Sequence, residues 1–84
     1  MKIEIITPDQ KVFEGDIRSV RVPGTKGSFQ VLKDHAPIVS TLENGPVILI
    51  DQSGNEKRYE INGGVIEVKS NRIILLAESV RSNS

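Results

Sequence analysis

The side chains that could carry out chemistry are few and lie far apart along the chain. The only histidine, His35, directly follows Asp34. Neighbouring residues of an extended chain point to opposite sides, so this carboxylate is poorly placed to orient the imidazole. Ser28 and Ser40 could serve as nucleophiles by type, but nothing places a base beside either of them. We therefore predict no catalytic residue, and we expect His35 to anchor a loop by hydrogen bonding.

Sites for metals, cofactors and phosphates are not indicated either. The chain has no cysteine and one histidine, and its carboxylates show no metal-ligand spacing. Residues 24–28 are rich in glycine, as phosphate-binding loops are. A β-rich run follows them, however, instead of the helix whose N-terminus would bind the anion. We predict no bound metal and no cofactor.

Length and charge narrow the function classes further. A chain of 84 residues favours a single domain over residues 1–84, because two cores could not each bury enough apolar surface. Its 11 basic and 11 acidic residues cancel, which disfavours nucleic-acid binding and with it a small oligonucleotide- or oligosaccharide-binding barrel. The longest apolar run, residues 73–77, is far shorter than the ~18 residues of a membrane span. We expect a soluble chain without direct membrane insertion.

The composition predicts an all-β fold. The chain contains 9 Val, 11 Ile and 3 Thr but only 2 Ala and 5 Leu, and β-branched side chains favour strands over helices. Clusters of Gly, Pro, Asn, Asp and Ser recur at short intervals between these apolar runs. That spacing is typical of an antiparallel sandwich or barrel.

Individual runs predict where side chains point. Ile3 and Ile5 share one face of an alternating strand. Within residues 17–22 the apolar positions change parity near Ser19, which predicts a bulge or a strand that passes between two sheets. The alternation of residues 57–61 places Tyr59 and Ile61 inward.

Two further runs are apolar at every position. Residues 47–50 and 73–77 are therefore expected to be central strands covered on both faces. Residues 53–55 and 70–71 carry turn residues between strand-like runs, so each predicts a hairpin tip. The polar residues 79–84 predict a frayed tail.

One alternative function follows from a hairpin tip. Small lipoyl and biotinyl carrier domains are all-β and present one lysine at such a tip, and Lys69 precedes the turn at residues 70–71. The flanking residues do not resemble the motif of those families, and an exposed lysine is usually only a solubilising residue. A carrier domain modified at Lys69 therefore remains the alternative function of this chain.

Several motifs, in order and at matching spacing, resemble one known family. They are Thr7-Pro8-Asp9 with Val12-Phe13-Glu14-Gly15, Val22-Pro23-Gly24 followed by Gly27, Phe29, Val31-Leu32 and His35-Ala36-Pro37, then Gly63-Gly64 with Val65-Ile66-Glu67-Val68, and Asn71 to Glu78. Over nearly its whole length the chain resembles the N-terminal β domain of the epsilon subunit of F-type ATP synthase, called delta in mitochondria. Gln30 departs from the pattern, because the family usually has glycine there.

The resemblance implies a flattened β-sandwich of about ten short antiparallel strands in two sheets, without a C-terminal helical hairpin. It also implies a non-catalytic subunit of the central-stalk rotor of a proton-translocating ATP synthase, linking the gamma subunit to the c-ring and coupling proton flow to ATP synthesis. Its expected location is the cytoplasmic face of a bacterial inner membrane, peripheral through the complex. Without the C-terminal helices, neither inhibition of hydrolysis nor nucleotide binding is expected.

The resemblance also assigns site residues. Those expected to face the c-ring are Gly24, Thr25, Lys26, Gly27, Ser28, Lys33, Asp34 and His35. Candidates for facing gamma come from the two runs that are apolar at every position, and they are Val47, Leu49, Ile74 and Leu76. The competing interpretation of these four is that the opposite sheet covers them.

Overall fold

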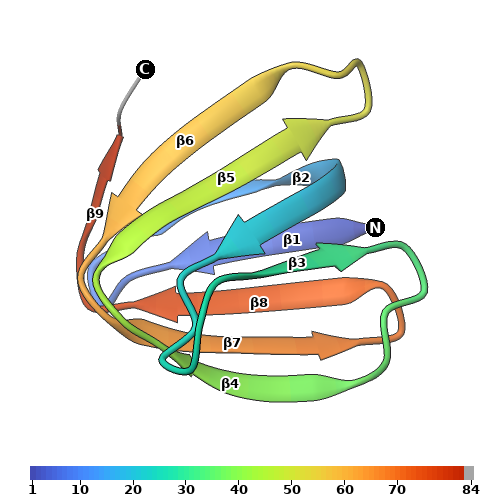
Figure 1. Ribbon diagram of the computed structural model, residues 1–84. Helices are drawn as coiled ribbons and strands as arrows, with labels where there is room; N and C mark the ends of the chain where they lie inside the picture. Colours follow the sequence, from blue (N-terminus) through green and yellow to red (C-terminus); the bar gives the residue numbers. More distant parts are fainter. Residues whose placement is uncertain (83–84) are drawn as a thin grey trace.

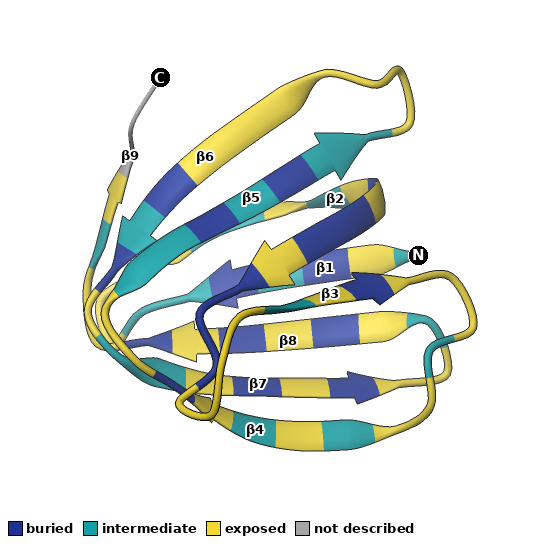
Figure 2. Ribbon diagram, in the orientation of Figure 1, coloured by how far each residue is buried: buried dark blue, intermediate teal, exposed yellow. Residues whose placement is uncertain are grey.

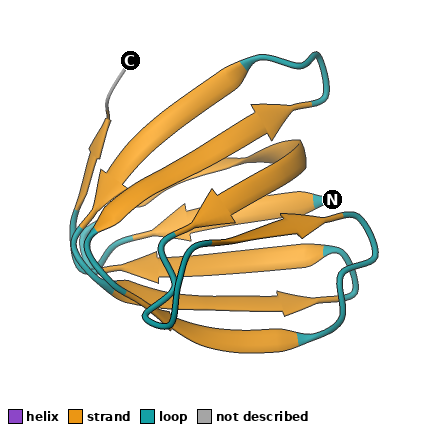
Figure 3. Ribbon diagram, in the orientation of Figure 1, coloured by secondary structure: helices purple, strands orange, loops and turns teal. Residues whose placement is uncertain are grey.

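The protein is built from β-strands. The computed structural model describes residues 1–82, in which nine strands form and no helix does (Figures 1 and 3). The strands are β1 (Lys2–Ile6), β2 (Lys11–Val22), β3 (Phe29–Leu32), β4 (Ile38–Leu42), β5 (Gly45–Asp51), β6 (Glu56–Ile61), β7 (Gly64–Lys69), β8 (Arg72–Ala77) and β9 (Val80–Ser82). This confirms the all-β class. Nothing among the described residues forms an apolar helix long enough to cross a bilayer.

The strands form two layers joined by β2. Hydrogen-bonded neighbours follow the order β4-β7-β8-β1-β2-β5-β6-β9, and β3 also pairs with β2. The first layer holds β4, β7, β8, β1 and the beginning of β2, while the second holds the end of β2 with β3, β5, β6 and β9 (Figure 1). The fold is therefore a flattened sandwich closed at one side by a shared strand.

The shared strand changes layers where the sequence predicts it. Up to Asp16, β2 pairs with β1, and from Ile17 onward it pairs with β5. The register against β5 shifts between Ile17 and Ser19, and Ser19 itself is buried. The extra residue of a bulge bends a strand and increases its twist. The prediction of a strand that passes between sheets near Ser19 is confirmed.

A single apolar layer between the two sheets forms the core. Along each strand buried and exposed residues alternate, because successive side chains of a strand point to opposite faces (Figure 2). Ile3, Ile5, Tyr59 and Ile61 are all buried, as predicted. The other buried hydrophobic residues are Ile17, Val20, Val22, Val31, Leu42, Val47, Leu49, Ile66, Val68, Ile73, Leu75 and Ala77.

Both predicted hairpin tips are confirmed. Between β5 and β6, the Asp51 carboxylate accepts hydrogen bonds from the amides of Ser53 and Asn55, both at 2.9 Å. Between β7 and β8, Ser70 and Asn71 have φ of 52° and 62°. Positive φ at both central residues suits the right-handed twist of a two-residue hairpin, and asparagine tolerates it well.

The described residues contain nine strands, in keeping with the expected number of about ten. The fold departs from the sequence-based expectation in two respects. One pairing, β1 with β8, is parallel. The expected fraying from Ser79 is wrong for Val80–Ser82, which pair with β6 while Val80 packs against the core. Backbone pairing holds this short segment despite its polar residues. Residues 83–84 of the expected tail lie outside the described part.

Gln30 fits a regular strand. It pairs with Arg21 across β2 and β3 and is not among the residues with positive φ. No left-handed conformation is therefore needed at this position, and a side chain there causes no backbone strain.

Candidate protein-docking surfaces

The loop of residues 24–28 is fixed at its base and exposed at its tip. The amide of Thr25 donates to the carbonyl of Thr41 at 3.1 Å, and the amide of Glu43 donates to the carbonyl of Pro23 at 2.8 Å. These bonds tie the base of the loop to the end of β4. Residues 25–28 are exposed, so the loop presents a supported tip to its surroundings.

Two glycines make the loop possible for different reasons. A Cβ at Gly24 would lie 2.7 Å from the carbonyl oxygen of Gly27 and 2.9 Å from the ring of Phe29, so no larger residue fits. Gly27 has open space around it, but its φ of 126° is unfavourable for other residues. The sequence therefore determines the shape of this loop locally.

A surface hollow lies between this loop and β4. It has a volume of about 620 Å³ and is lined by residues 24–29 and 38–41. The hydroxyls of Thr25 and Thr41 share a hydrogen bond of 2.8 Å, and Arg21 donates to the hydroxyl of Ser28 at 3.3 Å. The hollow thus combines hydroxyl groups with the apolar side chains of Phe29 and Val39.

Residues 33–35 form a separate cluster at the far end of β3. The amide of Asp34 donates to the side-chain oxygen of Asn71 at 2.7 Å, and the side-chain amide of Asn71 donates to the Asp34 carboxylate at 3.0 Å. We call this pair of bonds the Asp34–Asn71 clasp. Nδ1 of His35 lies 2.7 Å from the carbonyl oxygen of the next residue, Ala36, so the clasp and not the imidazole ties this loop to another element.

The eight residues expected to face the c-ring therefore do not form one cluster. The loop of residues 24–28 is bonded near the end of β4, whereas residues 33–35 precede its start (Figure 1). The four steps from the first to the last residue of β4 span roughly 13 Å at about 3.3 Å per residue, and this length separates the two clusters.

The outer surface of the first layer carries a group of apolar side chains, four exposed and one half-buried, which we call the apolar face. Its members are Ile6, Val39, Val65, Ile74 and Leu76. The strand register places Val65, Leu76 and Ile6 side by side across β7, β8 and β1. Val39 is 68% exposed and Leu76 50% exposed. A hollow of about 540 Å³ lies at one end of this face, beside Val65 and Leu76.

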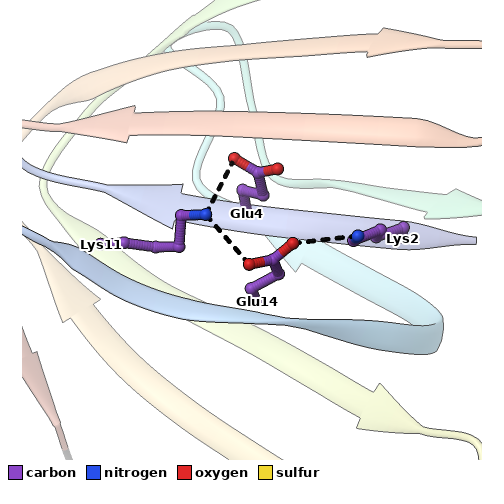
Figure 4. A network of polar contacts seen from close by, with 4 residues as sticks. All are labelled: Lys2, Glu4, Lys11 and Glu14. Atoms are coloured by element: carbon purple, nitrogen blue, oxygen red, sulfur yellow. Dashed lines mark hydrogen bonds and ion pairs between the residues drawn. The ribbon is translucent and has the colours of Figure 1, made fainter.

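A network of ion pairs borders the apolar face. Lys2 contacts Glu14 at 2.9 Å, and Lys11 contacts Glu14 at 3.0 Å and Glu4 at 3.8 Å (Figure 4). Hydrogen bonds from Lys2 and Lys11 lower the pKa of Glu14 from 4.5 to about 2. Glu4 stands opposite Ile74 in the register, so this balanced set of charges directly adjoins the apolar side chains.

Two of the four candidates for facing gamma are wrong. Val47 and Leu49 are fully buried between the layers, because alternation turns them toward the core, and the outward positions of β5 fall on Ile48 and Ile50. Ile74 and Leu76 do point outward. The expectation that β5 and β8 are covered on both faces fails for the same reason, since only one face of each strand is fully buried.

Val39, Val65 and Ile6 were missed as surface candidates. Val65 could have been found, because it alternates with the inward Ile66 and Val68. Val39 and Ile6 join the same surface only through strand pairing, which the sequence does not reveal.

No metal-binding cluster accompanies these surfaces in the described part of the chain. Residues 1–82 contain no group of three His, Asp or Glu side chains that could hold a metal. Ser28 accepts a hydrogen bond from Arg21, and Ser40 donates to the carbonyl of Thr41. The fold and its surfaces define a small β-sandwich domain suited to docking against other proteins.

Comparison with known proteins identifies the family. The sequence profile of the ATP synthase delta/epsilon chain β-sandwich domain matches residues 1–83. The chain is 42% identical to the ATP synthase epsilon chain of Chlorobium limicola, covering 94% of this chain and 90% of that one. It is 45% identical to the epsilon chain of Chlorobaculum tepidum, covering 93% and 89%. It is 36% identical to the longer epsilon chain of Salinibacter ruber, of which it spans 62%.

Solved structures share the fold. A chain of the mitochondrial ATP synthase of Euglena gracilis superposes with a TM-score of 0.90 at 17% identity, covering 95% of this chain and 51% of that one. A chain of the Tetrahymena thermophila enzyme gives a TM-score of 0.80 at 14% identity, covering 98% and 66%. At these identities the likeness concerns the fold alone.

The chain therefore belongs to the delta/epsilon chain family of ATP synthases, whose β-sandwich domain it forms. This confirms the sequence-based prediction of a rotor subunit of an F-type ATP synthase, a membrane-associated enzyme complex. The carrier-domain alternative at Lys69 is not supported.

Proposed function

We propose that this chain links the gamma subunit to the c-ring at the cytoplasmic face of a bacterial inner membrane. In that position it couples proton flow to ATP synthesis without taking part in the chemistry. The observation that carries the proposal is the apolar face, because it brings together four of the five large hydrophobic side chains that are exposed in the described part of the chain, and a protein partner could cover them.

The apolar face is the surface assigned to gamma. Contact with a partner would remove Val39, Ile74 and Leu76 from water, and burial of apolar area is the main favourable term in protein association. The outer surface of the second layer also carries apolar side chains, Leu32, Ile48 and Ile50, but Arg21 and Arg58 flank Ile48 there. An apolar centre with the ion pairs of β1 and β2 at its border matches the usual anatomy of an interface.

The loop of residues 24–28 is the surface assigned to the c-ring. Its exposed tip is polar, and the bonds to β4 keep its shape without a partner. A preorganised polar contact suits recognition by local charge and hydrogen bonding. A second cluster, Lys33, Asp34 and His35, lies at the opposite end of β4 from this loop. It is too distant to share the same small contact, so we assign it to the edge of the interface.

A non-catalytic role agrees with the side chains present. His35 bonds a neighbouring carbonyl, and neither Ser28 nor Ser40 hydrogen-bonds a base among the described residues. Nucleotide turnover is therefore assigned to other subunits of the complex, and no cofactor is required by this chain.

The test compares two exposed leucines on opposite layers. Leu76 on the apolar face is 50% exposed, and Leu32 on the second layer is 53% exposed. Leu76→Lys should weaken binding to a gamma-containing complex from which this chain has been removed by about tenfold or more, because a charge would be buried against apolar surface. Leu32→Lys, the matched control, should bind as the unmodified chain does.

Binding is measured by titration calorimetry, and circular dichroism checks that both variants keep the fold. Equal affinities of the two variants would reject the apolar face as the gamma surface. A chain that binds neither gamma nor the purified c-ring would reject the proposed function as a whole.

A further inference from the structure

The hollow beside the loop of residues 24–28 offers hydrogen-bond donors and no acidic group. Its lining includes one lysine, Lys26, and no aspartate or glutamate. Glu43 adjoins the base of the loop and Glu67 stands opposite Val39 on β7, but neither lines the hollow. The hollow is therefore cationic.

Some hydroxyl groups in the hollow have an O–H that is available to donate a hydrogen bond. In the pair formed by Thr25 and Thr41, one hydroxyl donates and the other retains its own O–H for a further acceptor. Ser28 accepts from Arg21, so its O–H also stays free. Ser40 differs, because its hydroxyl already donates to the carbonyl of Thr41.

The charge of Lys26 is not neutralised within the described part of the chain. The ion pairs of residues 1–82 involve Lys2, Lys11 and Arg58, and none includes Lys26. Arg21 adds a second cation behind Ser28. A partner that enters the hollow meets the ammonium group of Lys26 and free hydroxyl donors.

We propose that this hollow receives an acidic side chain from a polar loop of the c-ring, with its carboxylate bound by Lys26 and the free hydroxyls. The inference rests on the proposed function and specifies the chemistry of one of its contacts. A carboxylate offers acceptors only, which suits a hollow that presents one ammonium group and free hydroxyl donors. Phe29 supplies apolar surface against which the aliphatic part of a glutamate or aspartate would pack, and a free inorganic anion would leave that surface exposed.

The experiment measures binding of the full chain to purified c-ring from the same organism, at low and at moderate salt. Lys26→Glu should lower the affinity by about tenfold or more, because like charges repel at a contact that normally pairs opposite ones. Lys26→Met should cause a smaller loss and weaken the salt dependence. The control, Lys57→Glu on β6, makes the same change in net charge and should leave ring binding unchanged.

Binding to the gamma-containing complex separates this inference from the proposed function. All three variants should bind gamma as the unmodified chain does. If Lys26→Glu keeps full affinity for the ring, the acidic contact is wrong while the proposed function stands. If the unmodified chain does not bind the ring, both are wrong.

A charge swap gives the sharpest result. Lysine in place of the interacting carboxylate of the ring loop should restore binding of Lys26→Glu to within a few-fold of the original affinity. Failure of every acidic position of the ring loop to rescue the variant, or a ring loop without any acidic residue, would overturn the inference.

Discussion

Glu14 shows how single residues shape the border of the apolar face. Its carboxylate bonds Lys2 and Lys11 at once and so joins β1 to β2 across their register. The hydrogen bond from Lys2, followed by the one from Lys11, lowers the pKa of Glu14 to about 2, and the hydrogen bond to Glu14 raises the pKa of Lys11. Glu14 therefore keeps its negative charge well below the pH at which a carboxylate ordinarily becomes protonated.

The lowered pKa predicts a specific loss of stability in acid. Because the folded-state pKa of Glu14 lies below the ordinary 4.5, its contribution is present above pH 4.5 and is lost as the pH falls through about 2. We expect the stability difference between the unmodified chain and Glu14→Gln to be largest above pH 4.5 and to vanish near 2. Urea denaturation across this pH range measures the difference.

The control for Glu14→Gln is Glu43→Gln, which removes an exposed carboxylate outside the network. Added salt should reduce the effect of Glu14→Gln, since exposed ion pairs are screened. A difference that does not change between neutral pH and pH of about 2 would contradict the assignment of the low pKa to Glu14.

At the scale of elements, the Asp34–Asn71 clasp connects the loop after β3 to the turn between β7 and β8. Three polar contacts meet at Asn71, because its carbonyl oxygen also accepts the amide of Lys2 at 3.0 Å. The clasp therefore aligns the start of β4 with the ends of β7 and β8.

Asn71→Gly tests the clasp without disturbing the turn. Glycine accepts the φ of 62°, so only the two side-chain bonds are lost. Ser70→Gly is the matched control at φ 52°, with the same gain in unfolded-chain freedom. Asn71→Gly should lower the free energy of unfolding by about 1 kcal/mol more than Ser70→Gly does, as measured by chemical denaturation. It should also speed hydrogen exchange at the amide of Asp34, and equal exchange in both variants would argue against the clasp.

Comparing the expected strands with the observed ones shows which parts of the fold the sequence can predict. The crossing of β2 was predictable because a parity change near Ser19 is a local signal. Val47 and Leu49 were misassigned because a run that is apolar at every position does not reveal which side faces the core. The parallel pairing of β1 with β8 and the pairing of Val80–Ser82 with β6 depend on contacts between distant segments, which alternation alone does not encode.

At the scale of the whole molecule, a single core carries both the apolar face and the loop of residues 24–28. Leu75 and Leu76 are neighbours on β8, yet Leu75 is fully buried and Leu76 is half exposed. The first belongs to the core and the second to the apolar face. A substitution at Leu75 should therefore affect the stability of the domain, and one at the adjacent Leu76 should affect the apolar face.

This separation predicts unequal effects of two identical substitutions. Leu75→Ala should lower the free energy of unfolding by about 2–5 kcal/mol, which is a large part of the total stability of a small domain. Leu76→Ala should cost less than about 1 kcal/mol, because much of its surface is already in water. Thermal and urea denaturation measure both, and similar losses would contradict the burial pattern of β8.

The crossing of β2 has a mechanical consequence. Its twelve residues run from the charged border of the apolar face through the bulge and lead directly into the loop of residues 24–28. This strand is hydrogen-bonded to β1 in one layer and to β3 and β5 in the other. A force pulling along it is therefore shared by all of these hydrogen bonds at once. The domain would be stiff along this axis, so a twist imposed at one surface would reach the other with little lag.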